Sequence, residues 1–202
     1  MHVTVLGASG GTGLELTRQA LERGHTVTAV ARNPGSIPDS PRLVRVAADV
    51  RTASIAEALD GSKVVLSGLG NAKGDKPGAL TAGARAAVDA RPAHIVWLGA
   101  FGSGPSAAAA GWATRNLLRL MGAELVDKVT ADASVLAAGG TVFHAGPLSS
   151  GPLSQERRVV GLDSAPHRVF PARVSRATVA AAMLDEAENP RYLGAIAVPL
   201  ER

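Results

Sequence analysis

A cluster of glycines close to the amino end has the clearest chemical meaning in this sequence. It reads Gly7-Ala8-Ser9-Gly10-Gly11-Thr12-Gly13, a Gly-x-x-Gly-x-x-Gly pattern. In such a pattern Gly7 permits a tight turn, Gly10 lets a phosphate reach the backbone, and Gly13 lets a helix pack closely on a sheet. Hydroxyl donors from Ser9 and Thr12 add to the site. The pattern therefore predicts a site for a ligand that carries a diphosphate.

The segments on either side of the glycines show whether the cluster is a nucleotide site or a plain flexible turn. His2–Leu6 is a short apolar run typical of a buried strand, and Gly13–Arg23 has Leu14, Thr17 and Leu21 at helical spacing. A strand before the loop and a helix after it direct the free N–H groups of the helix N-terminus at the phosphates. This context favours a dinucleotide over the plain turn.

The end of the second predicted strand, Thr26–Ala31, indicates which dinucleotide to expect. NAD-binding folds place an acidic residue there to hold the ribose 2′-hydroxyl, whereas this chain has Arg32. A guanidinium pairs with a 2′-phosphate through two parallel hydrogen bonds. We therefore predict NADP (NADPH) in preference to NAD. The alternative interpretation is a surface arginine beside a turn.

Two further segments follow predicted strands and are expected at the same edge of the sheet. Asp49-Val50 follows the strand Leu43–Ala47, where the adenine would lie. Leu69-Gly70 follows the strand Lys63–Ser67, where small residues would admit the ribose and the nicotinamide. Both placements rest on a parallel topology alone, and both segments also fit ordinary loops.

Strands and helices alternate along the chain. Further strands are predicted at His94–Leu98, Thr141–His144 and Ala195–Val198, and further helices at Thr52–Leu59, Pro77–Ala90, Trp112–Ala138 (with a break near Gly122) and Ser175–Glu188. The order predicts an α/β fold with a single Rossmann-type, doubly wound parallel sheet and helices on both faces. We expect one domain over 1–202, with residues 145–202 as a small substrate or lid portion, and a mobile loop at Gly99–Gly111.

The composition argues against several classes of protein. Hydrophobic residues are 46% and charged residues 19%, which allows a full core and disfavours a disordered tail. Aromatic residues are only 3% and the basic residues are scattered, so no direct binding to nucleic acid is expected. The chain has no cysteine, which excludes disulfides and thiolate metal sites. It also has no apolar run long enough to suggest a membrane span. We expect a cytoplasmic protein that does not bind a membrane.

The glycine cluster, together with Val30-Ala31-Arg32, Asp49-Val50 and Leu69-Gly70, resembles the atypical short-chain dehydrogenase/reductases. Within that group the chain is similar to small NAD(P)H-binding proteins of the flavin reductase and biliverdin reductase B type and to NmrA-like regulators. The resemblance continues in Gly99-Ala100-Phe101, Asp127-Lys128 and Ser175-Arg176. It implies a Rossmann fold and a nicotinamide cofactor, and many functions share it.

The Tyr-x-x-x-Lys proton relay of the typical members of this group is absent. The one tyrosine, Tyr192, lies near the carboxyl end. When Lys128 is aligned with the relay lysine, Glu124 takes the place of the tyrosine and Gly99 that of the relay serine. A carboxylate is a poor proton donor unless burial raises its pKa. An alcohol dehydrogenase of the usual mechanism is therefore not expected.

Three residues remain as candidates for contact with the reacting groups. Lys128 would hold the nicotinamide ribose, His144 would donate a proton from the end of a strand, and Phe101 would stack on a planar ring. Their plainer interpretations are a solvated helix lysine, a hydrogen-bonded histidine and a core phenylalanine. Phe101 and His144 are the candidates for a substrate pocket. No histidine and carboxylate have the spacing of metal ligands, so no metal is expected.

Three functions fit these observations. The first is an NADPH-dependent reductase that passes a hydride to a flavin, a quinone or a similar planar acceptor. Water can protonate the reduced form of such an acceptor. The second is a sensor that binds NADP(H) and regulates a protein partner without catalysis. The third is an epimerase or dehydratase acting on a nucleotide sugar, for which the chain after the sixth predicted strand is short. We rank them in that order.

Overall fold

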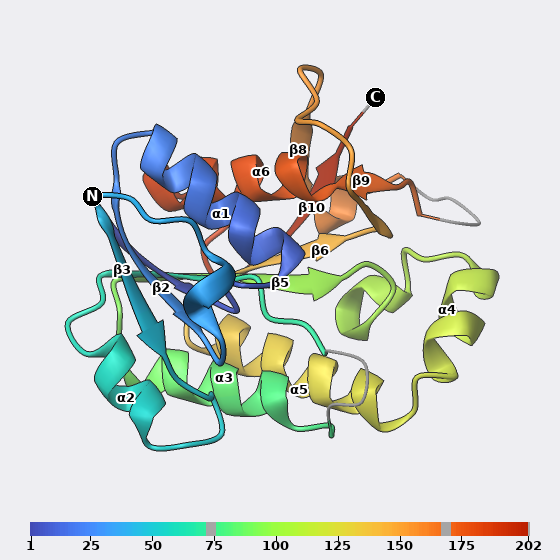
Figure 1. Ribbon diagram of the computed structural model, residues 1–202. Helices are drawn as coiled ribbons and strands as arrows, with labels where there is room; N and C mark the ends of the chain where they lie inside the picture. Colours follow the sequence, from blue (N-terminus) through green and yellow to red (C-terminus); the bar gives the residue numbers. More distant parts are fainter. Residues whose placement is uncertain (72–75, 167–170, 202) are drawn as a thin grey trace.

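A computed structural model describes residues 1–71, 76–166 and 171–201, with the side chains of residues 113, 115, 117 and 119 left out. Its centre is an eight-stranded sheet (Figure 1). In spatial order the strands are β3 (Leu43–Ala47), β2 (Thr26–Ala31), β1 (His2–Leu6), β4 (Val64–Ser67), β5 (His94–Ala100), β6 (Thr141–Ala145), β10 (Ile196–Leu200) and β8 (Arg158–Gly161).

Seven of these strands are mutually parallel, and the predicted doubly wound α/β fold is confirmed. The inner strands are buried apolar runs because helices cover both faces of the sheet. The edge strand β8 runs antiparallel to β10, which the sequence did not predict. Its four residues lie in a segment broken by proline and glycine, where no long apolar run marks a strand.

Helices form a layer on each face of the sheet (Figure 1). One layer holds α1 (Gly11–Glu22) and α6 (Arg176–Glu188), and the other holds α2 (Ser54–Leu59), α3 (Ala79–Asp89) and α5 (Ala123–Ala137), with α4 (Trp112–Arg119) to one side. Short 3-10 turns lie at η1 (Pro34–Ser36), η2 (Gly104–Ala107) and η3 (Leu162–Ser164). In the described part of the chain, no helix has both the length and the apolar character that a bilayer crossing requires.

The structure differs from the sequence prediction mainly where the elements are short. A two-stranded sheet of β7 (Leu148–Ser149) and β9 (Val174–Ser175) was not expected, because two residues carry no periodic signal. The long helical region after position 112 is indeed broken at Gly122, whose φ of +54° ends the helical path. The loop Gly99–Gly111, expected to be mobile, contains the end of β5 and the turn η2.

The carboxylate of Asp127 ties α5 to the start of α3. It accepts hydrogen bonds from the backbone N–H groups of Leu80 and Thr81, at 3.2 and 2.9 Å, and from the Thr81 hydroxyl at 2.6 Å. Burial alone would raise the pKa of Asp127, but these hydrogen bonds outweigh it and hold the pKa below its ordinary value. The negative charge at the N-terminus of α3 fixes the start of this helix to α5.

A second polar cluster lies at the other end of the sheet. His94, at the start of β5, is buried, with its Nε2 3.1 Å from the Thr141 hydroxyl. That hydroxyl in turn donates to the buried carboxylate of Glu186 at 3.0 Å. Burial lowers the pKa of His94, and the charge of Glu186 opposes this shift only in part.

This burial predicts a defined loss of stability in acid. Native His94 binds a proton less readily than the unfolded chain does, so unfolding takes up a proton below the ordinary pKa of 6.5. The free energy of unfolding should therefore fall as the pH drops through this range. Urea titrations at about pH 7.5 and about pH 5.5 should show a smaller fall in His94→Gln than in the parent. Exposed His2→Gln is the control. Equal falls in His94→Gln and the parent would contradict the prediction.

Candidate functional site

A cleft opens at the carboxyl ends of β1, β2, β3 and β4. The chain leaves β1 toward β2 on one side, while β4 lies on the other, so the strand order reverses here. Ligands of doubly wound sheets bind at such a switch point. The cleft is lined by Leu6, Gly7, Ser9, Gly10, Val30, Ala31, Arg32, Ala48, Asp49, Val50, Arg51, Gly68, Leu69, Gly70 and Ala79.

Most residues predicted to bind a cofactor come together in this cleft. The structure places Gly7, Ser9, Gly10, Arg32, Asp49, Val50, Leu69 and Gly70 in its lining. Gly11, Thr12 and Gly13 form the first turn of α1 directly after Gly10, and Thr12 is buried there. The segments are brought together by the parallel register, in which β1 pairs with β2 on one side and with β4 on the other.

Two of the glycines are required by the close approach of backbones. Gly7 has a φ of +69°, and a Cβ there would lie 3.0 Å from the Cα of Leu69. A Cβ on Gly13 would lie 2.7 Å from the Cα of Ala8, which places the start of α1 directly on the turn. At Gly10 the backbone is extended, and a Cβ would meet only the Gly7 carbonyl oxygen at 3.2 Å and the Gly68 carbonyl oxygen at 3.9 Å.

The N-terminus of α1 fits an anionic ligand. Gly10 is its N-cap residue, so no side chain accepts a hydrogen bond from the first N–H groups, and the first turn holds no acidic residue. Those N–H groups and the positive end of the helix dipole lie beside the cleft. Ser9 adds a hydroxyl to the lining. A diphosphate provides the acceptors that this arrangement lacks.

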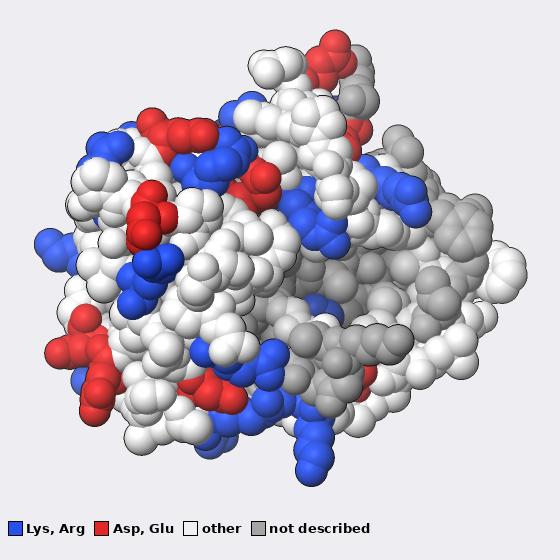
Figure 2. All heavy atoms as spheres, in the orientation of Figure 1, with Lys and Arg blue, Asp and Glu red and all other residues white. Residues whose placement is uncertain are grey.

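The end of the cleft formed by β2 and β3 is basic. Arg32 and Arg51 both line it, against one acid, Asp49. The Asp49 carboxylate accepts the backbone N–H of Arg51 at 2.9 Å, and the Arg51 guanidinium donates to the Lys76 carbonyl. Figure 2 shows Lys and Arg side chains around the hollow near the centre of this face. Ala31 pairs with Ala47, which places the segment after β3, and with it Arg51, beside Arg32.

Comparison with protein families shows to which family the chain belongs. A family model described as NAD(P)H-binding matches residues 7–190, nearly the whole chain. The chain belongs to the NAD(P)H-binding family. This confirms the family resemblance and the binding of a nicotinamide dinucleotide expected from the glycine cluster. No curated protein is similar enough in sequence to count as a match.

Solved structures with the same fold include several reductases. An anaerobillin reductase from Escherichia coli O157:H7 has 18% identity and a TM-score of 0.79, covering 100% of this chain and 97% of its own. A proposed NADH-flavin reductase from Streptococcus pneumoniae has 17% identity and a TM-score of 0.78, with 100% of both chains covered. A short-chain dehydrogenase/reductase from Veillonella parvula, in complex with NADP, has 16% identity and a TM-score of 0.81, covering 99% and 94%. At these identities the likeness establishes the fold.

Lys128 lies on α5 and is half-buried. Burial lowers the pKa of its ammonium group below the ordinary value, and the carboxylates of Asp132, Asp127 and Glu124 oppose this shift only in part. Lys128 is not among the residues that line the cleft. A half-buried lysine near the carboxyl side of the sheet stays a candidate for holding a ribose hydroxyl.

His144 is held inside the protein. Its Nδ1 lies 2.6 Å from the Ser106 hydroxyl and its Nε2 lies 3.2 Å from the Asp132 carboxylate, and all three side chains are buried. The Ser106 hydroxyl also accepts the N–H of Gly102 and donates to the Ser103 carbonyl. Both ring nitrogens of His144 therefore have partners, and the ring fastens the loop after β5 to β6.

The imidazole and the carboxylate occupy the space beside Gly99. A Cβ at this position would lie 2.7 Å from Cδ2 of His144 and 2.8 Å from Oδ2 of Asp132. Position 99 is where the family resemblance places a relay serine. The buried pair therefore leaves no room for that side chain.

Phe101, the other candidate for a substrate pocket, is also buried. It lines a separate, small apolar cavity with Gly146, Pro171 and Leu200 rather than the cleft. Neither Phe101 nor His144 lines the cleft, and their assignment to a substrate pocket stays a prediction.

Restoring the relay serine should destabilise the protein. In Gly99→Ser the new side chain would overlap His144 and Asp132, which should lower the free energy of unfolding by about 1–3 kcal/mol. In a His144→Ala background the contact with the imidazole is gone and only the contact with Asp132 remains, so the same change should have a smaller effect. Urea unfolding of the parent, both single variants and the double variant measures the difference. An effect of Gly99→Ser that is the same in both backgrounds would contradict this packing.

Proposed function

We propose that this protein is an NADPH-dependent oxidoreductase that passes a hydride to a flavin, a quinone or a similar planar acceptor. The proposal rests on two features seen together. One is a cleft that suits a dinucleotide, and the other is the position of the relay serine, Gly99, where buried side chains leave no space for a serine. The cleft supplies a place for the hydride donor, while the space beside Gly99 is filled by His144 and Asp132.

In this proposal, different residues of the cleft bind different parts of the dinucleotide. The N–H groups of Gly11, Thr12 and Gly13, with Gly7, Ser9 and Gly10 beside them, would hold the diphosphate. Asp49 and Val50 would contact the adenosine, and Leu69 and Gly70 would contact the nicotinamide half. When bound, the reduced nicotinamide supplies a hydride.

NADP is preferred to NAD in this proposal because Arg32 and Arg51 border the adenosine end. A 2′-phosphate there would meet at least one guanidinium. Among the described residues of the lining, a 2′-hydroxyl would find one carboxylate, Asp49, which already accepts the backbone N–H of Arg51. Phosphate and guanidinium form two parallel charge-assisted hydrogen bonds.

We infer a planar redox acceptor because, among the described residues, His144 and Tyr192 are held in hydrogen bonds and do not line the cleft. The sole tyrosine, Tyr192, lies in the segment between α6 and β10. Its hydroxyl donates a hydrogen bond to the Val159 carbonyl at 3.0 Å. Reduced flavins and quinols take their protons from water, so their reduction needs little acid catalysis by protein. The names of two structural neighbours, a proposed NADH-flavin reductase and an anaerobillin reductase, support the same class of acceptor.

Anaerobic oxidation of NADPH in the presence of FMN, or of a soluble quinone, tests the proposal directly. The parent should reduce at least one of these acceptors, and Gly10→Val should abolish both binding and turnover because its side chain takes the space of the diphosphate. Gly35→Val is the matched control, since no heavy atom lies within 4 Å of its Cβ position. Tight binding of NADPH without turnover of either acceptor would instead support the non-catalytic sensor.

The preference for NADP should reverse in Arg32→Asp. One charge-assisted contact at a partly screened site is worth ~1–3 kcal/mol, which corresponds to an affinity for NADP(H) about tenfold to a hundredfold above that for NAD(H). The aspartate removes this contact, repels the phosphate and offers the ribose hydroxyl an acceptor. Calorimetric titrations of both cofactors, at low and moderate salt, measure the change, since salt should weaken NADP(H) more. Equal affinities in the parent would refute the preference, and an unchanged preference in Arg32→Asp would assign it to Arg51.

A further inference from the structure

Arg176, the first residue of α6, lies across the first residue of α1. A Cβ built on Gly11 would lie 2.8 Å from Cδ and 2.9 Å from Nε of Arg176. Gly11 needs no positive φ and takes no part in the tight turn at Gly7. A side chain at position 11 would therefore require Arg176 to move.

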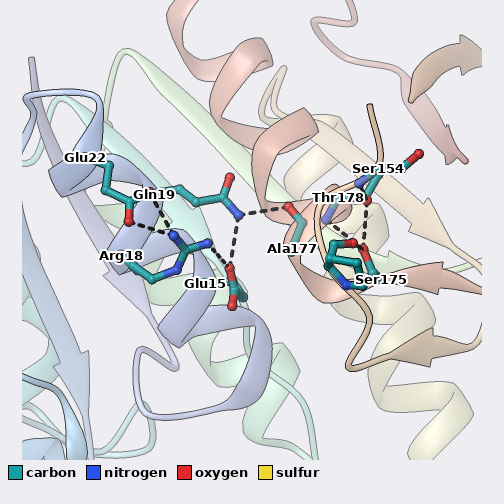
Figure 3. Close-up of polar contacts among 9 residues, drawn as sticks. Glu15, Arg18, Gln19, Glu22, Ser154, Ser175, Ala177 and Thr178 are labelled. Carbon is teal, nitrogen blue, oxygen red and sulfur yellow. Dashed lines mark hydrogen bonds and ion pairs between the residues drawn. The ribbon is translucent and has the colours of Figure 1, made fainter. Parts of the chain in front are cut away.

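The start of α6 is held by hydrogen bonds to α1, within its own first turn and to the loop that contains Ser154 (Figure 3). The Gln19 amide, on α1, donates to the Ala177 carbonyl on α6 at 2.9 Å. The Ser175 hydroxyl caps α6 by accepting the N–H of Thr178 at 3.1 Å, and the N–H of Ser154 donates to the Thr178 hydroxyl at 3.0 Å. Arg176 is thus carried by a helix start that is fixed relative to α1.

The guanidinium of Arg176 has one weak partner in the described part of the chain. Its Nη1 donates to the Ser150 hydroxyl at 3.3 Å, and no carboxylate among the described residues forms an ion pair with it. The neighbouring first turn of α1 also lacks an acidic residue and a side-chain cap. A positive side chain therefore borders a positive helix end, an arrangement that an anion between or beside them would stabilise.

We infer that Arg176 is a binding residue for the diphosphate of the dinucleotide, reaching over Gly11 from α6. The inference rests on the proposed placement of the diphosphate at the first turn of α1. The helix end offers N–H groups and a partial charge, whereas Arg176 adds a full charge and a planar pair of donors. Because NAD and NADP share the diphosphate, Arg176 serves both cofactors equally, in contrast to Arg32.

Calorimetric titration of Arg176→Gln with NADH, NADPH and ADP-ribose tests this assignment. All three affinities should fall by about 10- to 100-fold, the loss expected for a charge-assisted hydrogen bond, with the NADPH-to-NADH ratio unchanged. Arg158→Gln, on the edge strand β8, removes the same charge elsewhere and should leave the affinities unchanged. Arg176→Lys should give an intermediate loss, since it keeps the charge without the planar donors.

A double-mutant cycle with Gly11→Ala separates a direct contact from a general effect of charge. The new methyl group should displace Arg176 and weaken binding in the parent, but it should have little further effect in Arg176→Gln. Thermal unfolding of each variant checks that it is folded. If folded Arg176→Gln binds all three ligands within twofold of the parent while Gly10→Val does not bind, the inference is overturned and the proposed site stands. If Gly10→Val binds normally, the site itself is wrong.

Discussion

The close packing of the first turn of α1 on the turns that follow β1 and β4 sets the geometry of the whole cleft. A Cβ at Gly68 would lie 2.9 Å from the backbone nitrogen of Gly13, and one at Gly7 would lie 3.0 Å from Leu69. Three backbone segments thus meet without side chains between them. Any larger residue would push α1 away from the strand ends, and its N–H groups would no longer border the cleft.

Positive groups line this cleft and lie beside it in an order that suits the proposed dinucleotide. Arg32 and Arg51 stand at the end formed by β2 and β3, the N-terminus of α1 lies in the middle, and Arg176 lies over Gly11 from the neighbouring helix. These groups come from four separate segments of the chain. The parallel sheet places Arg32, Arg51 and the N-terminus of α1 at one edge. The contact between Gln19 and Ala177 places Arg176 beside them.

The sequence was informative where the signal is local. The glycine cluster and Arg32 follow strands whose apolar runs are plain, so their place at the sheet edge could be predicted from a few neighbouring residues. Arg176 and Gly11 are 165 positions apart, and only the packing of α1 on α6 makes them neighbours. His144 was correctly expected at a strand end, but its partners Ser106 and Asp132, 38 and 12 positions away, could not be read from that strand.

The buried group formed by Ser106, Asp132 and His144 explains why the relay position has no side chain. A glycine at 99 allows the imidazole and the carboxylate to approach the strand, and the hydrogen bond to Ser106 then holds the loop after β5. Polar side chains that have lost contact with water stabilise a fold only while their hydrogen bonds persist. Such a group is suited to fastening a loop rather than to giving up a proton in each turnover. In the proposed reaction the proton that completes the reduction comes from water, which suits an acceptor such as a flavin or a quinone.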